Sequence, residues 1–393
     1  MPSRGRGEGQ GGASRPTKIE FVSPDVIVIG AGAIGTSTAY QLAKAGLKVM
    51  VLDRGRVGGE ATGASAGMIQ LNPDRGTPPA FSALGAESAR LFTALAAELL
   101  ERTGIDIGYR RASLLHVTLD EAEEAQLRAH RAWQVDQGMS VGWLDGAAAV
   151  DVEPALNPGV RAALLYEDHY QILPRVLAQA LARAATDLGA AVLEGAAADR
   201  LLIQGDRVVG VAVGGETIRS PETVIANGTW ASAWSNTLQT PIPVRPVRGQ
   251  MVALSTSATP LRHAVSSNSG YVLTKADGST IVGTTVEEVG FDARPTAAGI
   301  AGLLALASRL VPRLADATVL SAWAGLRPGT PDRLPLLGRP PGWDGIVLAT
   351  GHFREGILLA PITGELVLDL VARRRPRLPL DAFDPGRFLV RAA

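Results

Sequence analysis

The stretch DVIVIGAGAIG, residues 25–35, decides the fold of this chain. Its first half is a short apolar run rich in β-branched residues, which is typical of a buried strand. Gly30, Gly32 and Gly35 then follow in the spacing G-x-G-x-x-G. The first glycine permits a tight turn, the second lets a pyrophosphate approach bare backbone, and the third lets a helix pack closely on the strand.

The sequence after this motif supplies the remaining parts of a nucleotide-binding unit. A helix-like segment ends near Gly46, and the apolar run 49–52 closes with Asp53. The N-terminus of the helix would attract phosphate, and an acid at the end of the second strand can bind ribose hydroxyls. The order of strand, glycine turn, helix, strand and acid therefore predicts dinucleotide binding, without deciding which dinucleotide.

The composition excludes several classes of protein. The chain has 393 residues, and its 38 Lys and Arg balance its 38 Asp and Glu, so it has no general attraction for nucleic acid or an anionic membrane. It has no cysteine, which excludes disulfides, thiolate metal sites and a flavin attached through cysteine. No apolar run reaches the length of a membrane span. We expect a globular, cytoplasmic protein.

Changes in hydrophobic period predict a tail and two domains. Residues 1–20 are rich in Gly, Arg, Ser and Gln and lack an apolar core, which indicates a disordered tail rather than a secretory signal. The fold class is α/β, or mixed α+β, with a Rossmann-like cofactor domain interrupted by an antiparallel-sheet substrate domain. The cofactor domain is expected to take residues 21–104, 146–240 and 322–393, and the substrate domain residues 105–145 and 241–321. The last helix is expected to begin at Gly356.

A loop rich in small residues, GRVGGEATGASAGM at 55–68, directly follows Asp53. Many free backbone N–H groups suit an extended polyanion, so we expect this loop to line the cofactor; a flexible surface loop is the alternative. The loop contains GASAG, which matches the hydrolase pattern G-x-S-x-G with Ser65 as nucleophile. That motif needs a strand running into the serine, and GGEAT is not a strand, so the sequence disfavours a hydrolase.

The titratable residues point away from acid–base or metal chemistry. The five histidines show no metal-ligand spacing, Asp168 beside His169 is best interpreted as a structural pair, and no two carboxylates form an evident couple. A redox cofactor should therefore carry the reaction. Arg327, at a strand end, and Arg354, before the last helix, are candidates to bind a substrate carboxylate, although surface ion pairs are the alternative. Tyr271 could supply a hydroxyl, although half-buried packing is the alternative.

Five segments together resemble the FAD-dependent D-amino-acid oxidase superfamily, and within it the glycine oxidases of thiamine biosynthesis. They are DVIVIGAGAIG, ATGASAGM, VIANGTW, WAGLRPGTPDRLPLLG and GHFREGILLAPITG, and the resemblance runs from about residue 25 to 375. It implies non-covalent FAD and no metal, with Ala198 meeting the adenine through its backbone and Asp53 in place of the usual, longer glutamate. The remaining implied cofactor residues are Gly30, Gly32, Ala33, Ile34, Gly35, Arg54, Ala61, Thr62, Ala66, Gly67, Met68, His352, Phe353, Arg354, Glu355, Gly356, Ile357 and Leu358.

The resemblance also implies a reaction. Arg327 would bind the substrate carboxylate with Tyr271 and Arg354 beside it, and the flavin would carry the chemistry without a protein acid or base. Glycine or another small amine, such as sarcosine or D-alanine, would pass a hydride from Cα to flavin N5. Dioxygen would then reoxidise the flavin, so the products would be a 2-oxo acid, ammonia and hydrogen peroxide.

Several alternatives stay open at this point. Ser269 stands where glycine oxidases have a histidine, two residues before the tyrosine, so the preferred amine is undecided. A D-amino-acid or sarcosine oxidase or dehydrogenase would share the same motifs. A dinucleotide-binding sensor without turnover is an alternative of a different class. The oligomeric state is also open, and a homo-oligomer is compatible with the sequence.

Overall fold

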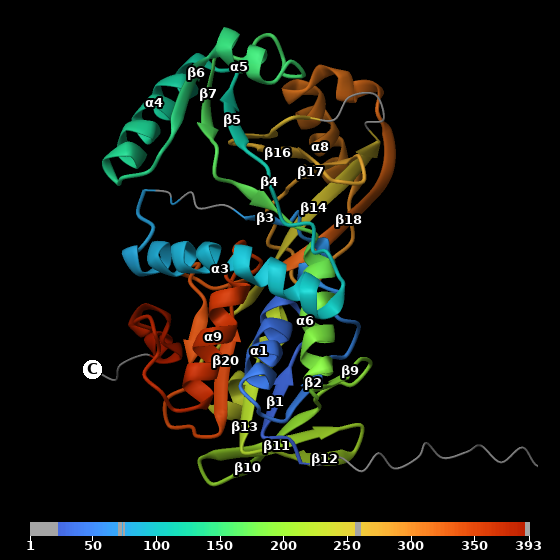
Figure 1. Ribbon diagram of the computed structural model, residues 1–393, viewed down its shortest axis with the longest axis vertical. Coiled ribbons are helices and arrows are strands. Elements are labelled where there is room, and N and C mark those ends of the chain that lie inside the picture. Colours follow the sequence, from blue (N-terminus) through green and yellow to red (C-terminus); the bar gives the residue numbers. More distant parts are fainter. Residues whose placement is uncertain (1–22, 70–72, 74, 256–260, 390–393) are drawn as a thin grey trace, which may run out of the picture.

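The computed structural model describes residues 23–69, 73, 75–255 and 261–389. The predicted tail, residues 1–20, lies outside them. Two large sheets organise the molecule, one in each half of the view in Figure 1. Within the described residues, no helix combines the length and apolar character needed to cross a bilayer. The mixed α/β fold is confirmed.

The lower half contains a six-stranded sheet in the order β19-β20-β13-β1-β2-β9. β19 runs antiparallel to β20, and the other pairs are parallel. β1 reads VIVI and is buried at every position, because both faces of the sheet are covered. The strands are β1 (Val26–Ile29), β2 (Val49–Leu52), β9 (Ala191–Leu193), β13 (Glu222–Ile225), β19 (Leu336–Gly338) and β20 (Ile346–Thr350).

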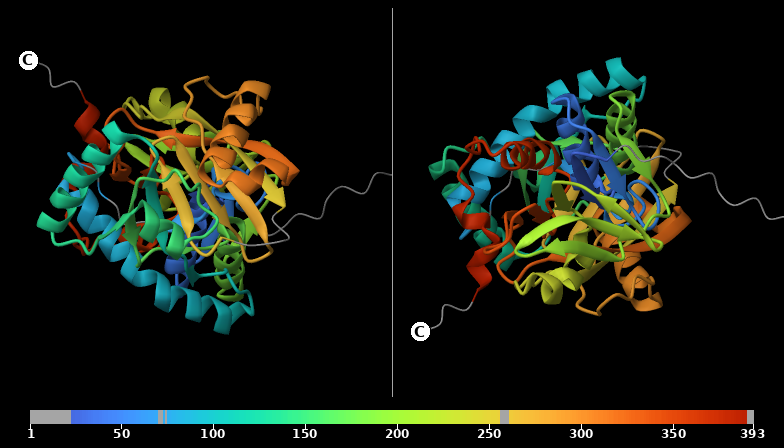
Figure 2. Two further views of the ribbon diagram at one scale, coloured as in Figure 1. Left: turned by 90° about the horizontal axis from the view of Figure 1, so that it is seen from above. Right: turned by 90° about the horizontal axis from the view of Figure 1, so that it is seen from below.

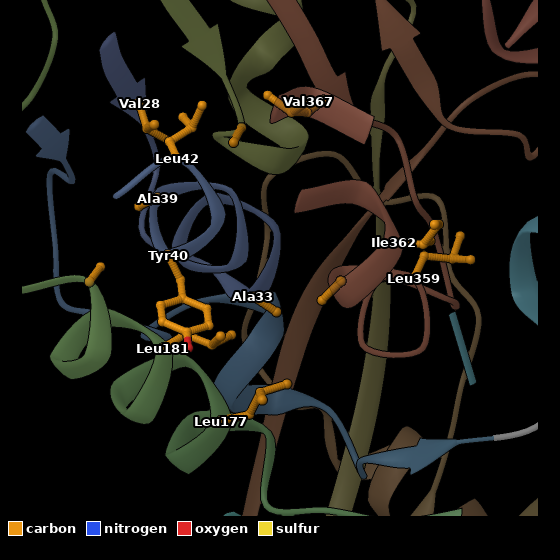
Figure 3. Packing of buried hydrophobic residues seen from close by; sticks show 14 of the residues in the cluster. Val28, Ala33, Ala39, Tyr40, Leu42, Leu177, Leu181, Leu359, Ile362 and Val367 are labelled. Atoms are coloured by element: carbon orange, nitrogen blue, oxygen red, sulfur yellow. The ribbon is translucent and has the colours of Figure 1, made fainter. Parts of the chain in front are cut away.

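Helices cover one face of this sheet. They are α1 (Ala33–Lys44), α6 (Pro174–Asp187) and α9 (Ala360–Val371), and α3 (Pro79–Thr103) packs across α6 and α9. Figure 3 shows Tyr40 of α1 facing Leu177 and Leu181 of α6, all in one buried cluster. α3, coloured cyan, runs along the outside of the molecule in both views of Figure 2. Its Ser88 donates to the Leu358 carbonyl at 2.6 Å, which ties it to the segment before α9.

A small antiparallel sheet covers the other face. Alternate residues of β1 and β2, such as Ile27 and Leu52, pack there against Val211 and Ile218. This three-stranded sheet consists of β10 (Arg200–Gln204), β11 (Arg207–Val213) and β12 (Glu216–Arg219). Beside it lie the 3-10 helix η1 (Gly228–Trp234) and the short helix α7 (Ser235–Leu238).

The upper half contains an eight-stranded sheet in the order β18-β14-β17-β16-β15-β5-β7-β6. Its pairs are antiparallel except β5 with β15, which are parallel. The strands are β5 (Leu114–Thr118), β6 (Gly142–Asp145), β7 (Ala162–Tyr166), β14 (Arg245–Ser255), β15 (Ala264–Ser267), β16 (Gly270–Thr274), β17 (Ser279–Gly283) and β18 (Thr318–Gly329). The remaining elements of this half are α4 (Glu121–Asp136), α5 (Gly146–Val152), α8 (Ala297–Leu310) and η2 (Pro312–Asp316).

Strand pairing departs from the expected domain division at two places. β7 (Ala162–Tyr166) lies in the stretch 146–240 expected for the cofactor domain, but it pairs between β5 and β6. β18 crosses the expected boundary at residue 322, because it pairs with β14 from Thr318 to Gly329, with one register shift between Ala253 and Leu254. A second small sheet, β3 (Met68–Ile69), β8 (Tyr170–Gln171) and β4 (Arg110–Arg111), joins the two halves. The division into two domains stays a prediction.

The last helix begins later than its sequence indicates. α9 starts at Ala360, not at Gly356, and Pro361 occupies its first turn. The segment before it makes separate turns, with Glu355 N–H donating to the His352 carbonyl at 2.9 Å and Leu359 N–H to the Glu355 carbonyl at 2.8 Å. Phe353 has φ of +48°, which is not helical. The chain therefore reaches the helix only after an irregular segment. Two 3-10 turns, η3 (Asp381–Phe383) and η4 (Pro385–Phe388), follow it.

Candidate active site

A cavity of about 1360 Å³ is lined by residues from both large sheets. It exceeds the roughly 300–1000 Å³ typical of sites for drug-sized ligands, so it suits a dinucleotide together with a small substrate. Of the residues predicted from sequence, only Gly35 and Leu358 do not line it. Those that do are Gly30, Gly32, Ala33, Ile34, Asp53, Arg54, Ala61, Thr62, Ala66, Gly67, Met68, Ala198, Tyr271, Arg327, His352, Phe353, Arg354, Glu355, Gly356 and Ile357.

The glycine turn after β1 forms a bare cradle at one end of the cavity. Gly30 has φ of +107°, and a Cβ there would lie 2.6 Å from the Ala226 carbonyl oxygen. A Cβ on Gly35 would lie 1.8 Å from the Gly30 carbonyl oxygen, so Gly35 serves helix packing behind the cavity. Gly32 is the N-cap of α1 and has no side-chain cap. The first helical N–H, of Ala33, donates to Thr62 Oγ1 of the small-residue loop at 3.0 Å. The N–H groups and dipole at a helix N-terminus still favour binding of an anion such as phosphate beside it.

Asp53 is turned back onto this cradle. Its carboxylate accepts hydrogen bonds from Ala31 N–H at 2.6 Å and from Gly55 N–H at 2.7 Å. Each oxygen keeps a further acceptor site, so a contact with ribose stays a prediction. The next residue, Arg54, lies over the ring of Trp230 at 3.8 Å and pairs with Glu60 at 3.2 Å. Trp230 is a cavity residue that sequence reasoning did not single out.

The loop of small residues is held from both halves of the molecule. Trp323 Nε1 donates to the Ala64 carbonyl at 3.1 Å, and Ile172 N–H donates to the Gly67 carbonyl at 2.8 Å. Lys275 donates to the carbonyls of Ala66 and Ile172, and burial lowers its pKa to about 8. Sequence reasoning missed Lys275, because it lies beside a hairpin turn where a solvated lysine is the ordinary expectation.

The loop does not form a nucleophile elbow. Ser65 follows the short helix α2 (Ala61–Ala64) rather than a strand, and its hydroxyl accepts from Gly67 N–H at 3.2 Å. The strand–serine–helix context that a G-x-S-x-G hydrolase requires is therefore missing here.

Arg327 reaches the cavity by crossing a neighbouring strand. It stands on β18, and its guanidinium lies over Gly249 of β14, where an added Cβ would come within 2.2 Å of Nη2. Beyond β14, Nη2 donates to Thr284 Oγ1 at 2.7 Å and Nη1 to the Thr285 carbonyl at 3.3 Å. Burial lowers the pKa of Arg327, but a guanidinium stays protonated in proteins. No carboxylate among the described residues forms an ion pair with it.

Tyr271 and Arg354 lie close enough to Arg327 to affect its pKa, which Tyr271 raises and Arg354 lowers. The Tyr271 ring lies over Gly283, where an added Cβ would come within 2.8 Å of the hydroxyl. Burial raises the pKa of Tyr271 to about 12, although Arg327 and Arg354 act to lower it. The Tyr271 hydroxyl is therefore neutral at physiological pH. Arg354 is more exposed and lies 5.4 Å from the Phe353 ring centre.

The segment from His352 connects β20 to this end of the cavity. Phe353 N–H donates to the Pro328 carbonyl at 3.0 Å, which joins the segment to the strand carrying Arg327. His352 is 2% exposed, and its Nε2 lies 3.1 Å from Thr363 Oγ1. Burial lowers the pKa of His352 to about 3, so its imidazole is neutral.

Sequence reasoning also missed a row of polar residues across the eight-stranded sheet. Tyr271 stands opposite Ser266, and Ser266 stands opposite His116, so their side chains share one face. All three line the cavity, and His116 Nδ1 lies 2.9 Å from Ser266 Oγ. Only the pairing of β5 with β15 reveals this row, because the two strands are far apart in sequence.

No metal site is present in the part of the chain that the structure describes. No group of three or more His, Asp or Glu side chains there could hold an ion. Asp168 pairs with Arg111 at 3.0 Å, whereas His169 stacks on Tyr166 with ring centres 5.2 Å apart. Burial lowers the pKa of His169 to about 4. Asp168 and His169 therefore have separate partners, and the absence of a metal stays a prediction.

Known proteins resemble this chain over nearly its whole length. Glycine oxidase of Pseudomonas aeruginosa is 36% identical over 93% of this chain and 99% of its own. The crystal structure of glycine oxidase from Geobacillus kaustophilus superposes with a TM-score of 0.89, at 34% identity, over 93% of this chain and 99% of that one. The bifunctional protein ThiO/ThiG of Nostoc is 36% identical over 92% of this chain but only 55% of its own. Residues 25–370 match the family described as FAD dependent oxidoreductase, DAO. The chain belongs to this family of FAD-dependent oxidoreductases.

Proposed function

We propose that this chain is an oxidase that uses dioxygen and water to convert glycine and other small amines, such as sarcosine and D-alanine, to the 2-oxo acid and hydrogen peroxide. The nitrogen product is ammonia from glycine and D-alanine and methylamine from sarcosine. One observation carries the proposal. Arg327, a guanidinium without a carboxylate partner among the described residues, opens into the same cavity as the glycine cradle at Gly30. Such a cation is a ready fork for the carboxylate of an amino acid.

The residues at the other end of the cavity fit FAD. The N-terminus of α1 and the bare turn at Gly32 suit the pyrophosphate. The loop at 61–68 is held close against the same space, with Thr62 Oγ1 accepting from Ala33 N–H at 3.0 Å. Asp53 and Ala198 would meet the adenosine, and residues 352–357 would run along the flavin ring. The chain has no cysteine, so attachment through cysteine is excluded. When bound, FAD supplies the redox chemistry: it accepts a hydride from the amine and passes the electrons to dioxygen.

The protein side chains would bind and orient the substrate rather than transfer protons. Arg327 would form two charge-assisted hydrogen bonds to the carboxylate, and each bond of this kind contributes about 1.5–3 kcal/mol. The neutral Tyr271 hydroxyl can donate a further hydrogen bond, and Arg354 adds positive charge at the exposed side of the site. These groups would favour amines that carry a carboxylate.

Several finer points belong to this proposal. Ser269, in place of the glycine oxidase histidine, lines the cavity, so the preferred amine is still to be measured. The relative named ThiO/ThiG supports a role in thiamine biosynthesis. A cytoplasmic location, a homo-oligomeric state and the division into cofactor and substrate domains are likewise proposals. The same geometry would serve a D-amino-acid or sarcosine oxidase or dehydrogenase.

An anaerobic titration tests the proposed function. Purified protein containing FAD is mixed without air with glycine, sarcosine, D-alanine or D-proline, and the flavin absorbance is followed. We expect glycine to bleach the flavin and air to restore the colour with formation of hydrogen peroxide. Reduction without peroxide, with electrons passing only to an artificial acceptor, would indicate a dehydrogenase. A flavin that none of these amines bleaches would favour the non-catalytic sensor instead.

A further inference from the structure

One segment of the chain contacts both faces of β14 beside the substrate end of the cavity. This segment, residues 284–296, joins β17 to α8. On the cavity face, its Thr284 and Thr285 accept the two hydrogen bonds that Arg327 makes within the described residues. Thr284 Oγ1 in turn donates to the Gln250 carbonyl of β14 at 3.1 Å. The orientation of Arg327 therefore depends on where this segment lies.

The opposite face of β14 fixes the segment through Glu287. Arg248 and Gln250 are 5% and 0% exposed. Arg248 Nε donates to Glu287 Oε2 at 2.8 Å, and Gln250 Nε2 donates to Glu287 Oε1 at 2.8 Å. The main chains of Arg248 and Glu287 also exchange hydrogen bonds of 2.8 and 3.0 Å. Each oxygen of this one carboxylate is thus bound by a buried side chain of the strand that Arg327 crosses.

Gln250 extends the network to the far end of the segment. Its Oε1 accepts from Thr296 N–H at 2.7 Å, and Thr296 caps α8 through Gly299 N–H. Burial acts to raise the pKa of Glu287, but hydrogen bonds from Thr285, Arg248 and Gln250 lower it overall. Glu287 is therefore ionised when the segment is in place.

We propose that Glu287 is a positioning residue for substrate binding. Its carboxylate, held by Arg248 and Gln250, fixes the segment whose Thr284 and Thr285 orient Arg327. The inference rests on the proposed function, because it takes Arg327 as the group that binds the substrate carboxylate. Glu287 itself lies on the face of β14 away from the cavity and touches neither substrate nor cofactor.

The fold can tolerate removal of this charge. Arg248 also faces Asp292, with Nη1 and Oδ2 3.4 Å apart, so its buried cation keeps a counter-charge when Glu287 is replaced. Glu287→Gln keeps the size and one acceptor oxygen of the side chain, so the main effect is on the hydrogen bonds to Arg248 and Gln250. Glu288→Gln is a matched control, because the adjacent Glu288 is exposed.

The test uses the FAD-loaded enzyme and acetate as a carboxylate probe. The dissociation constant of acetate is measured from the change that it causes in flavin absorbance, alongside KM and kcat for glycine and the dissociation constant of FAD. We expect Glu287→Gln to weaken acetate binding roughly tenfold and to raise KM for glycine by the same factor. An effect of this size is typical when two residues belong to one hydrogen-bond network. The values of kcat and FAD affinity should stay within about twofold of wild type, as should every value for Glu288→Gln.

A double-mutant cycle separates positioning from general destabilisation. When Arg327 is already replaced by Met, Glu287→Gln should have no further effect on acetate binding, because the group that it positions is absent. Glu287→Asp, which keeps the charge, should restore part of the lost affinity. If Glu287→Gln failed to hold FAD, the Glu287→Asp variant would carry the test, with an intermediate loss expected.

Three results would overturn the inference, two of them alone and the third together with the proposed function. Wild-type affinity for acetate in the Glu287→Gln enzyme would refute the positioning role alone. An equal loss in the Arg327→Met background would also refute it, because the effect would not pass through Arg327. A wild-type enzyme that binds acetate nowhere near the flavin and is not reduced by glycine would refute the proposed function, and this inference with it.

Discussion

Replacing Gly249 with alanine should disable Arg327 without unfolding the protein. An alanine Cβ at this position would lie 2.2 Å from Nη2, 2.3 Å from Nη1 and 2.4 Å from Cζ of Arg327. All three atoms belong to the far end of a flexible side chain, and Gly249 does not have the left-handed φ that disfavours alanine. The guanidinium should therefore move away while the pairing of β14 with β18 stays intact.

The size of the effect follows from the bonds that the displaced guanidinium would lose. It would leave its contacts with Thr284 Oγ1 and the Thr285 carbonyl and would no longer point at the substrate carboxylate. A charge-assisted hydrogen bond contributes about 1.5–3 kcal/mol, so losing one or both to the substrate should raise KM by roughly 10-fold to more than 100-fold. Affinity for FAD should be unchanged, because the glycine cradle is untouched.

The assay is peroxide formation against glycine concentration, with bound FAD measured by absorbance. Gly302→Ala in α8 is the control, because an added Cβ there meets no atom within 4 Å. A Gly249→Ala enzyme with the wild-type KM would refute the reasoning, since it would mean that substrate binding does not need Arg327 in this position. Loss of FAD together with substrate binding would point instead to a collapse of the whole cavity.

Three further predictions use other parts of the molecule. Arg327→Lys should keep bound FAD but raise KM for glycine roughly tenfold or more, because a point charge cannot reproduce the planar fork of a guanidinium. An unchanged KM in steady-state kinetics at saturating FAD would refute this role of Arg327. Asp53→Asn should lower the stability of the FAD-free protein by about 1–3 kcal/mol, because an amide nitrogen cannot accept one of the hydrogen bonds from Ala31 and Gly55 N–H. An unchanged midpoint of urea unfolding would contradict these two hydrogen bonds. The folded-state pKa values of His169 and His352, about 4 and about 3, lie below the ordinary 6.5, so the unfolded chain binds more protons as pH falls below 6.5. The free energy of unfolding should therefore fall by about 2 kcal/mol per histidine between pH 7 and pH 5. Urea unfolding curves that coincide at the two pH values would exclude this pH dependence.

Local sequence patterns are enough to predict the first strand and helix of the cofactor-binding sheet. The strand, glycine turn and helix at 25–44 depend on neighbours within one βαβ unit, and the structure has them where the pattern predicts. The start of α6 at Pro174 and the capping of α8 by Thr296 are equally local features. The start of α9 was predicted wrongly, because the positive φ at Phe353 and the separate turns around Glu355 depend on contacts with β18 rather than on helix propensity.

What the sequence could not reveal is how side chains cross from one strand to the next. Arg327 was found through a motif, but its reach depends on Gly249, a residue on another strand that has no motif of its own. Gly283 gives the Tyr271 ring the same kind of room. Each glycine leaves room for a side chain from a neighbouring strand. Only the strand register shows which side chain lies over it.

This arrangement explains why the substrate end needs a large sheet rather than a loop. A guanidinium that binds a carboxylate must be held in one orientation, and side chains gain that orientation from rigid elements. Arg327 starts on β18, crosses β14 and ends on the segment after β17, so three neighbouring parts of one sheet fix a single cation. Glu287 anchors the last of these parts from the opposite face. Substrate binding should therefore be sensitive to changes on a surface of the sheet that no substrate reaches.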